Sequence, residues 1–192
     1  IGHVAGLVAE KNEQNIWRGQ DGNTGEYDGL TTLASNDASV ITVSSSGTVT
    51  ANNVITELGS IVDAIPSAIY NKEDLHIYIS QNIARAYVRA LGGFASGVGS
   101  NGVNAQGTMW YNGNGALSFD GVKLFVANGL ADNTAMAAQK SNLYFGTGLL
   151  NDMNEVKVLD MSDIDGSQNV RVVMRYTGAV QYGIGSNIVY YS

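Results

Sequence analysis

Residues 54–91, VITELGSIVDAIPSAIYNKEDLHIYISQNIARAYVRAL, decide the fold of this chain. Their first part carries apolar residues at helical spacing, namely Val54, Ile55, Leu58, Ile61, Val62 and Ile65. Pro66 ends this helix, and its start has a capping asparagine, Asn52 or Asn53. Leu75–Ile79 alternates Leu and Ile with His and Tyr, which is typical of a strand with one buried face. Ser80 then caps a second helix that runs to Leu91, so the stretch predicts a helix–strand–helix unit.

The residues before this unit predict one further helix and a long irregular segment. Apolar residues fall on one helical face at Ile1, Val4, Ala5 and Val8. This helix reaches Arg18, and a glycine-rich turn follows at 19–25. No capping residue precedes Ile1, so we expect that residues upstream are missing from this sequence. A short ordered piece is expected at 28–33, and then an exposed loop or hairpin over 34–53, with short strands at 40–43 and 48–50.

The residues after the unit are rich first in glycine and then in strands. Residues 92–118 form a glycine-rich loop, longer than most loops in compact domains. A strand at 122–127 and a helix near 133–140, capped by Asp132, come next. Asp165-Gly166-Ser167 is expected to be a hairpin turn, and the strand after it to be half-buried. Strands are expected at 143–145, 155–161, 170–176, 179–184 and 188–191, so the fold class is α+β.

Composition narrows the possible functions. Only 14% of the 192 residues are charged, so we expect neighbouring subunits to cover part of the surface. The net charge of −7 argues against a protein that binds nucleic acid directly, because an acidic surface repels phosphates. The chain has no cysteine, which excludes disulfides and thiolate chemistry. No stretch is apolar over the roughly 18 residues that a membrane span needs.

Three groups of residues resemble cofactor-binding, metal-binding or catalytic motifs in residue type. Gly97, Gly99 and Gly102 match a dinucleotide fingerprint, but no strand precedes them and no helix follows, so no cofactor is predicted. The aspartates at 160, 163 and 165 lack the spacing of a calcium loop, so no metal is predicted. The two histidines are expected to be surface or hydrogen-bonded residues, since no catalytic partner is evident for His3 or His76.

Aromatic residues leave two interpretations open. Trp17, Trp110 and the ten tyrosines fit a sugar-binding face. They fit a subunit interface equally well, because Tyr and Trp bury a large area while keeping one polar contact.

The order of elements resembles the tailed-phage major capsid proteins, which have the Hong Kong 97-type fold. The opening helix with the segment Gly22-Asn23-Thr24-Gly25-Glu26-Tyr27-Asp28-Gly29-Leu30 resembles the end of that family's spine helix and the turn after it. Residues 54–90 resemble the start of its axial domain, and 119–126 resemble its returning strand, although Lys123 stands where a proline is common. The closing block is similar at 142–147, 156–160, 170–175 and 178–183.

This resemblance implies a non-enzymatic subunit of an icosahedral shell, made in the cytoplasm of a bacterial host and located in the virion capsid. Residues 1–50 would hold the end of the spine helix and a peripheral segment, 51–142 the axial domain with its loop at 92–118, and 143–192 the closing strands. Partners would be copies of the same chain in pentamers and hexamers, with scaffold or portal proteins as further candidates. The candidate inter-subunit contacts are Phe94, Trp110 and Tyr111.

Some relatives in that family cross-link a lysine of an extended loop to an asparagine of the closing region. Asn169 lies near the matching place, but the extended loop would precede Ile1, so the resemblance implies no cross-link here. The alternatives are an encapsulin-like compartment shell, a secreted carbohydrate-binding or adhesin module, and a hydrolase with a site that sequence does not reveal.

Overall fold

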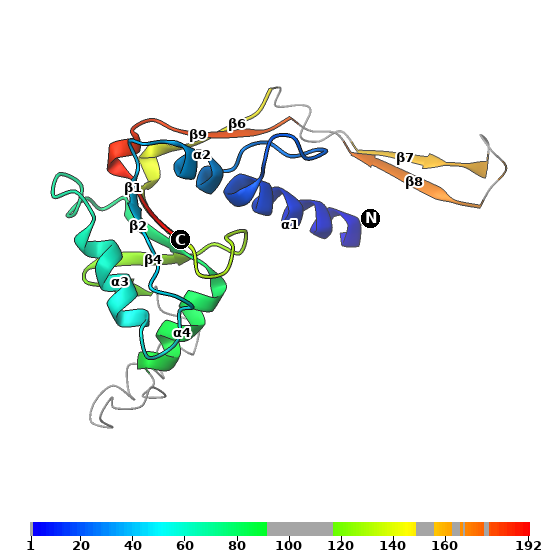
Figure 1. The fold of residues 1–192 in the computed structure, drawn as a ribbon. Helices are drawn as coiled ribbons and strands as arrows, with labels where there is room; N and C mark the ends of the chain where they lie inside the picture. The colour runs from blue at the N-terminus through cyan, green and yellow to red at the C-terminus, as the bar shows by residue number, and fades with distance from the viewer. Residues whose placement is uncertain (1, 92–116, 149–155, 163–165, 167, 175–176) are drawn as a thin grey trace.

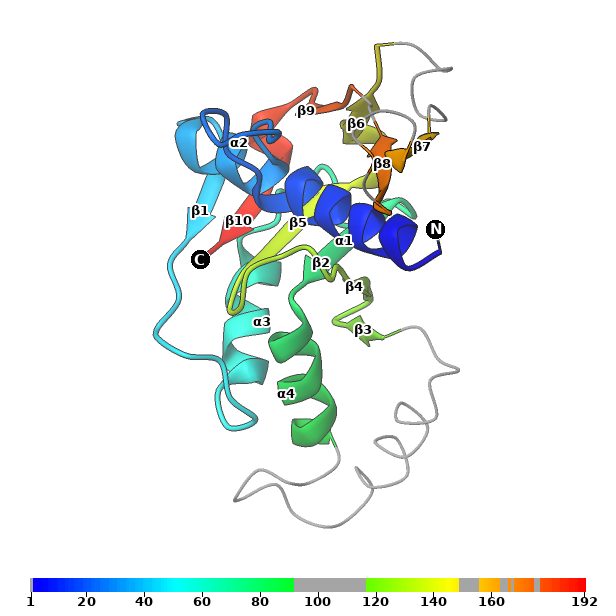
Figure 2. The ribbon, with the colours of Figure 1, turned by 90° about the vertical axis from the view of Figure 1, so that its right-hand side faces the viewer.

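A six-stranded mixed sheet between two layers of helices forms the body of the molecule in the computed structural model (Figures 1 and 2). The structure describes residues 2–91, 117–148, 156–162, 166, 168–174 and 177–192. The strand order is β1-β10-β5-β2-β4-β3, with parallel pairs β1–β10 and β2–β4 and antiparallel pairs elsewhere. These strands are β1 (Ile41–Val43), β2 (Leu75–Ile79), β3 (Ser118–Phe119), β4 (Val122–Val126), β5 (Ala135–Gln139) and β10 (Val189–Tyr191).

The predicted helix–strand–helix unit is confirmed. Its strand lies within the sheet, and its two helices cover one face of the sheet. It consists of α3 (Val54–Asp63), β2 and α4 (Gln81–Leu91). β2 alternates buried and partly buried residues, as its Leu/Ile and His/Tyr alternation predicts. The inward side chains of β2 meet α3 and α4 in one apolar core, whose least exposed members are Val54, Leu58, Ile61, Ile77, Ile79 and Ile83.

The opposite face of the sheet lies under α1 (Gly2–Arg18) and α2 (Leu30–Asn36). Trp17 at the end of α1 packs on Tyr78 of β2, with their ring centroids 5.1 Å apart. The turn between the helices forms as predicted, with positive φ angles of 108° at Gly22 and 78° at Gly25. Gly29 has no room for a side chain, since an added Cβ would lie 2.6 Å from backbone atoms of Trp17.

The predicted helix near 133–140 is wrong, because the structure places β5 there, followed by the short helix η1 (Lys140–Asn142). β5 lies between β10 and β2, and all five of its residues are buried. A strand covered on both faces is mostly apolar, so its sequence does not alternate, and the one polar residue of β5, Gln139, donates a hydrogen bond to Asp74. Ala and Met favour helices in isolation, and the tertiary packing overrides that preference. Asp132 therefore caps no helix there.

The residues that precede α3 and α4 differ in detail from the predicted strand and helix caps. Residues 48–50 are not a strand, although the Val49 amide donates to Asn133 Oδ1 at 2.9 Å. Asn53 occupies the position before α3, but its Oδ1 accepts from the Thr50 amide at 2.7 Å and does not cap the helix. Ser80 precedes α4 as expected, and its hydroxyl donates to Asn82 Oδ1 at 2.7 Å.

The closing strands form two small antiparallel sheets outside the body. One pairs β6 (Leu143–Gly146) with β9 (Ala179–Tyr182), and the short helix η3 (Gly185–Asn187) leads from it to β10. The other pairs β7 (Val156–Asp160) with β8 (Val170–Met174) and extends away from the body as a hairpin (Figure 1). A half-buried strand was expected over 170–176; Val172 is partly buried, but Val170, expected on the same buried face, is exposed.

Candidate inter-subunit surface

The three predicted contact residues, Phe94, Trp110 and Tyr111, lie outside the described residues. Their role stays a prediction. The Gly97, Gly99 and Gly102 motif lies outside the described residues as well, as do Asp163 and Asp165. The candidate surface within the described residues therefore lies on the sheet with its helices or on the β7–β8 hairpin.

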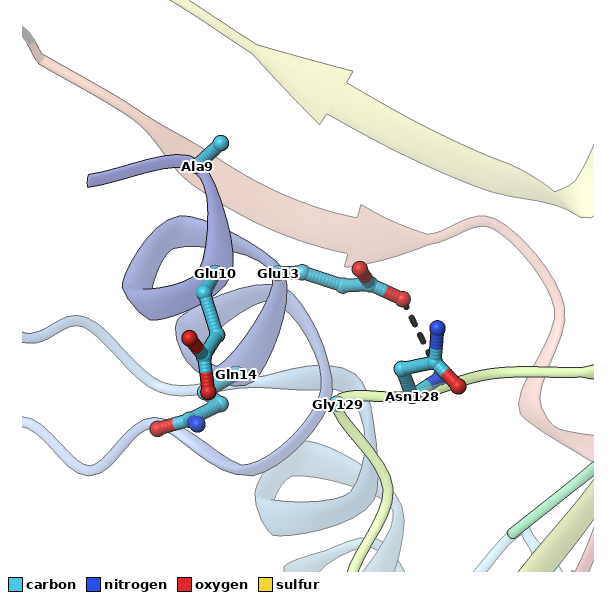
Figure 3. A pocket seen from close by; sticks show the side chains of 6 residues that line it. All are labelled: Ala9, Glu10, Glu13, Gln14, Asn128 and Gly129. Carbon is cyan, nitrogen blue, oxygen red and sulfur yellow. Dashed lines mark hydrogen bonds between the residues drawn. The ribbon is translucent and has the colours of Figure 1, made fainter. Parts of the chain in front are cut away.

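A groove of about 410 Å³ lies beside α1. Figure 3 shows Glu10 and Glu13 on α1 and, facing them, the loop after β4 with Asn128 and Gly129. The amide of Asn128 donates to Glu13 Oε1 at 3.1 Å, which ties that loop to the helix. The groove is lined by carboxylates, amides and small residues, and it contains no nucleophile beside a base, so it offers no covalent chemistry.

A second hollow surrounds Asp37 and Tyr182, close to α2 and β9. The Tyr182 hydroxyl donates to Asp37 Oδ2 at 2.9 Å, and the Ser39 amide donates to Asp37 Oδ1 at 2.8 Å. Hydrogen bonds from Ser39 and from Tyr182 hold the pKa of Asp37 below its ordinary value. Burial, and then the bond to Asp37, raise the pKa of Tyr182 to about 12. This hydrogen bond ties the residue that follows α2 to β9.

Glu57 is a buried carboxylate with a structural role. It is 6% exposed on α3, and it accepts hydrogen bonds from Ser46 and, at 2.8 Å, from the Tyr191 hydroxyl. Burial opposes ionisation of Glu57, but the two hydroxyl donors outweigh it and lower its pKa. The network joins α3 to the loop before it and to the last strand, β10.

The two histidines and the first tryptophan also have structural positions. His3 is exposed on α1. His76 Nδ1 lies 2.9 Å from the Asp74 carbonyl oxygen, which is the hydrogen-bonded role expected for it. Trp17 is only 7% exposed, so it cannot stack on a sugar. It therefore does not support a carbohydrate-binding face.

Within the described residues, no group of three or more His, Asp or Glu side chains could hold a metal ion. None of the described helices is long and apolar enough to cross a membrane.

Asp74 supplies the clearest electrostatic prediction. It accepts from Ser141 Oγ at 2.5 Å and from Gln139 Nε2 at 3.0 Å, and these bonds lower its pKa to about 2. A carboxyl whose folded pKa is depressed stabilises the fold above its unfolded pKa, and this contribution disappears as pH falls through the folded value. We expect Asp74→Asn to make the urea midpoint less sensitive to pH between about 4 and 2 than the parent midpoint is. Equal slopes for the two proteins would contradict this expectation.

Exposed apolar side chains lie on several parts of the molecule, and α1 and the β7–β8 hairpin are among them. Leu7 on α1 is 52% exposed, and on the hairpin Val158 is 50% and Val170 is 64% exposed. Sequence reasoning missed this surface, since it expected the hairpin strand to be half-buried. The signal in the sequence was the charged Arg171 between Val170 and Val172. A charge at this position indicates that one face of the strand is not covered by a core. This arrangement is suited to association with another protein surface.

Comparison with known proteins identifies the fold. No family model matches the chain, and no curated protein matches it. A chain from Mycobacterium phage Che8 superposes with a TM-score of 0.64 at 13% identity, over 98% of this chain and 60% of that one. A chain of the satellite phage P4 procapsid, in a structure that includes the size determination (Sid) protein, gives 0.59 at 7% identity, over 99% and 64%.

A virus-like particle from Pyrococcus furiosus gives a TM-score of 0.56 at 10% identity, over 97% of this chain and 64% of that chain. The chain therefore has the mixed α+β fold of phage capsid and virus-like particle structures. It spans about 60–64% of the length of these three neighbours.

Proposed function

We propose that this chain is the shell-forming part of a tailed-phage major capsid protein with the Hong Kong 97-type fold. The observation that carries the proposal is the match of nearly the whole chain to chains from a phage, a procapsid and a virus-like particle. The low charge and the exposed apolar side chains of α1 and the hairpin support a protein that is covered by copies of itself.

The proposal assigns parts of the chain to parts of a capsid subunit. α1 is the end of the spine helix, and residues 51–142 are the axial domain, whose core contains α3, α4 and the strands β2, β4 and β5. Residues 143–192 are the closing strands. The loop at 92–118, with Phe94, Trp110 and Tyr111, is the candidate contact around the symmetry axis.

Expression of the reading frame that contains this chain tests the proposed function. We expect closed shells of uniform size in negative-stain images, together with a sedimentation coefficient far above that of a single subunit. A protein that stays monomeric at high concentration would contradict the proposal. Trp110→Ser combined with Tyr111→Ser is expected to reduce shell formation if the glycine-rich loop is an assembly contact.

An encapsulin-like compartment is the second candidate, and the similarity to the Pyrococcus furiosus virus-like particle favours it. Neighbouring genes distinguish the two. Terminase and portal genes indicate a phage capsid, whereas a cargo enzyme indicates a compartment. Purified shells that contain a protein cargo and no DNA would support the compartment.

A further inference from the structure

The hairpin of β7 and β8 has little support from the rest of the described chain. Among the described residues its two strands pair only with each other, so each has an outer edge of backbone groups that no described strand covers. A two-stranded hairpin alone in water is marginally stable at best, and exposed strand edges are prone to pair with other chains. In Figure 1 the hairpin extends past the N-terminal end of α1, which places it within reach of another molecule.

The strand register divides the hairpin into two faces. Residues directly opposite each other point to the same side, and Leu159 faces Arg171 while Lys157 faces Val173. We call this side, made of Lys157, Leu159, Arg171 and Val173, the basic face. The other side carries the pair Val158 and Val172 and the pair Asp160 and Val170. The basic face thus presents a leucine and a guanidinium group side by side, in a protein whose net charge is −7.

The N-terminal half of α1 presents the matching groups. Leu7 and Glu10 are three residues apart, so they lie next to each other on one side of the helix, and both are exposed. Glu10 also borders the groove of Figure 3. Within the described part of the chain neither Glu10 nor Arg171 makes an ion pair. Each surface therefore combines one apolar side chain with one charge, and the charges are opposite.

We propose that the basic face of the hairpin in one copy docks on α1 of a second copy, with Arg171 against Glu10 and Leu159 against Leu7. Every copy then donates a hairpin and receives one, which is a head-to-tail contact that continues from subunit to subunit. The inference rests on the proposed function, because it names the surfaces through which copies of the chain associate. Burial of the two leucines supplies apolar contact, and the ion pair sets the register.

Disulfide trapping tests the contact without background, since the chain has no cysteine. Leu7→Cys and Leu159→Cys proteins of different tag length are purified separately, mixed before assembly, and oxidised. We expect a disulfide-linked dimer that contains one chain of each length. Ile55→Cys, an exposed position on α3, replaces Leu7→Cys in the matched control and should give no such dimer with Leu159→Cys.

A charge exchange provides the second measurement. Arg171→Glu and Glu10→Arg are each expected to reduce trapping about tenfold, and the two together to restore it. Arg85→Glu on the exposed side of α4 is the control and should leave the yield unchanged. If light scattering shows assembly but no mixed dimer forms, the proposed contact is wrong while the proposed function stands. Absence of any assembly would overturn both the contact and the proposed function, and a cross-link within one chain of a Leu7→Cys, Leu159→Cys protein would overturn the contact.

Discussion

Replacing Ile77 with alanine is expected to lower the free energy of unfolding by about 2–5 kcal/mol. Ile77 is fully buried in β2, with β4 on one side and β5 on the other. Its side chain lies in the core beneath α3 and α4, where the surroundings cannot close over a missing group without moving a strand of the sheet. The lost apolar contact and the remaining cavity therefore both contribute to the loss.

Urea unfolding followed by circular dichroism measures this effect. Ile55→Ala on α3 is the matched control, because Ile55 is an isoleucine of the same unit and is 44% exposed. Its free energy of unfolding should stay within about 0.5 kcal/mol of the parent value. Similar losses for both variants would mean that the core does not lie where β2 meets the helices.

Much of this core could be predicted from the sequence, because local spacing determines it. The stripe from Val54 to Ile65 and the alternation in β2 each depend on neighbours only a few residues apart. Both signals were confirmed by buried side chains, except at Ile55, which the stripe predicted to be buried and which is exposed. The strand order could not be predicted in the same way. β5 pairs with β2 through residues 60 positions apart, such as Ile77 and Ala137, and no local pattern records that pairing.

The candidate surface was less predictable than the core. Arg171 and Glu10 are ordinary exposed charges in the sequence, and only the register of β7 with β8 places Arg171 beside Leu159. The groove beside α1 depends on Asn128 and Gly129, which lie more than a hundred residues from Glu10 and carry no motif. A contact between copies requires two surfaces of complementary shape. Sequence spacing describes the residues of one segment and does not show which two surfaces match.

Gly129→Ala is expected to destabilise the protein by about 3 kcal/mol, because the loop after β4 touches the backbone of α1 at this residue. A Cβ there would lie 2.7 Å from the carbonyl carbon of Glu13 and 2.7 Å from Trp17 Cδ1. Backbone cannot move aside as a flexible side chain can, so we expect α1 to shift away from the sheet. Gly59→Ala in α3 is the control. Nothing lies within 4 Å of its added Cβ, and it should gain about 0.5–1 kcal/mol from helix propensity.

The fluorescence of Trp17 reports whether α1 has moved. In a Trp110→Phe background Trp17 is the only tryptophan, and its burial against Tyr78 should give blue-shifted emission in the parent. Gly129→Ala should shift this emission to the red under native conditions, before global unfolding, while Gly59→Ala leaves it unchanged. Loss of stability without a red shift would mean that the strain is absorbed in the loop. In that case α1 keeps its position, and the groove beside Glu10 remains intact for a partner.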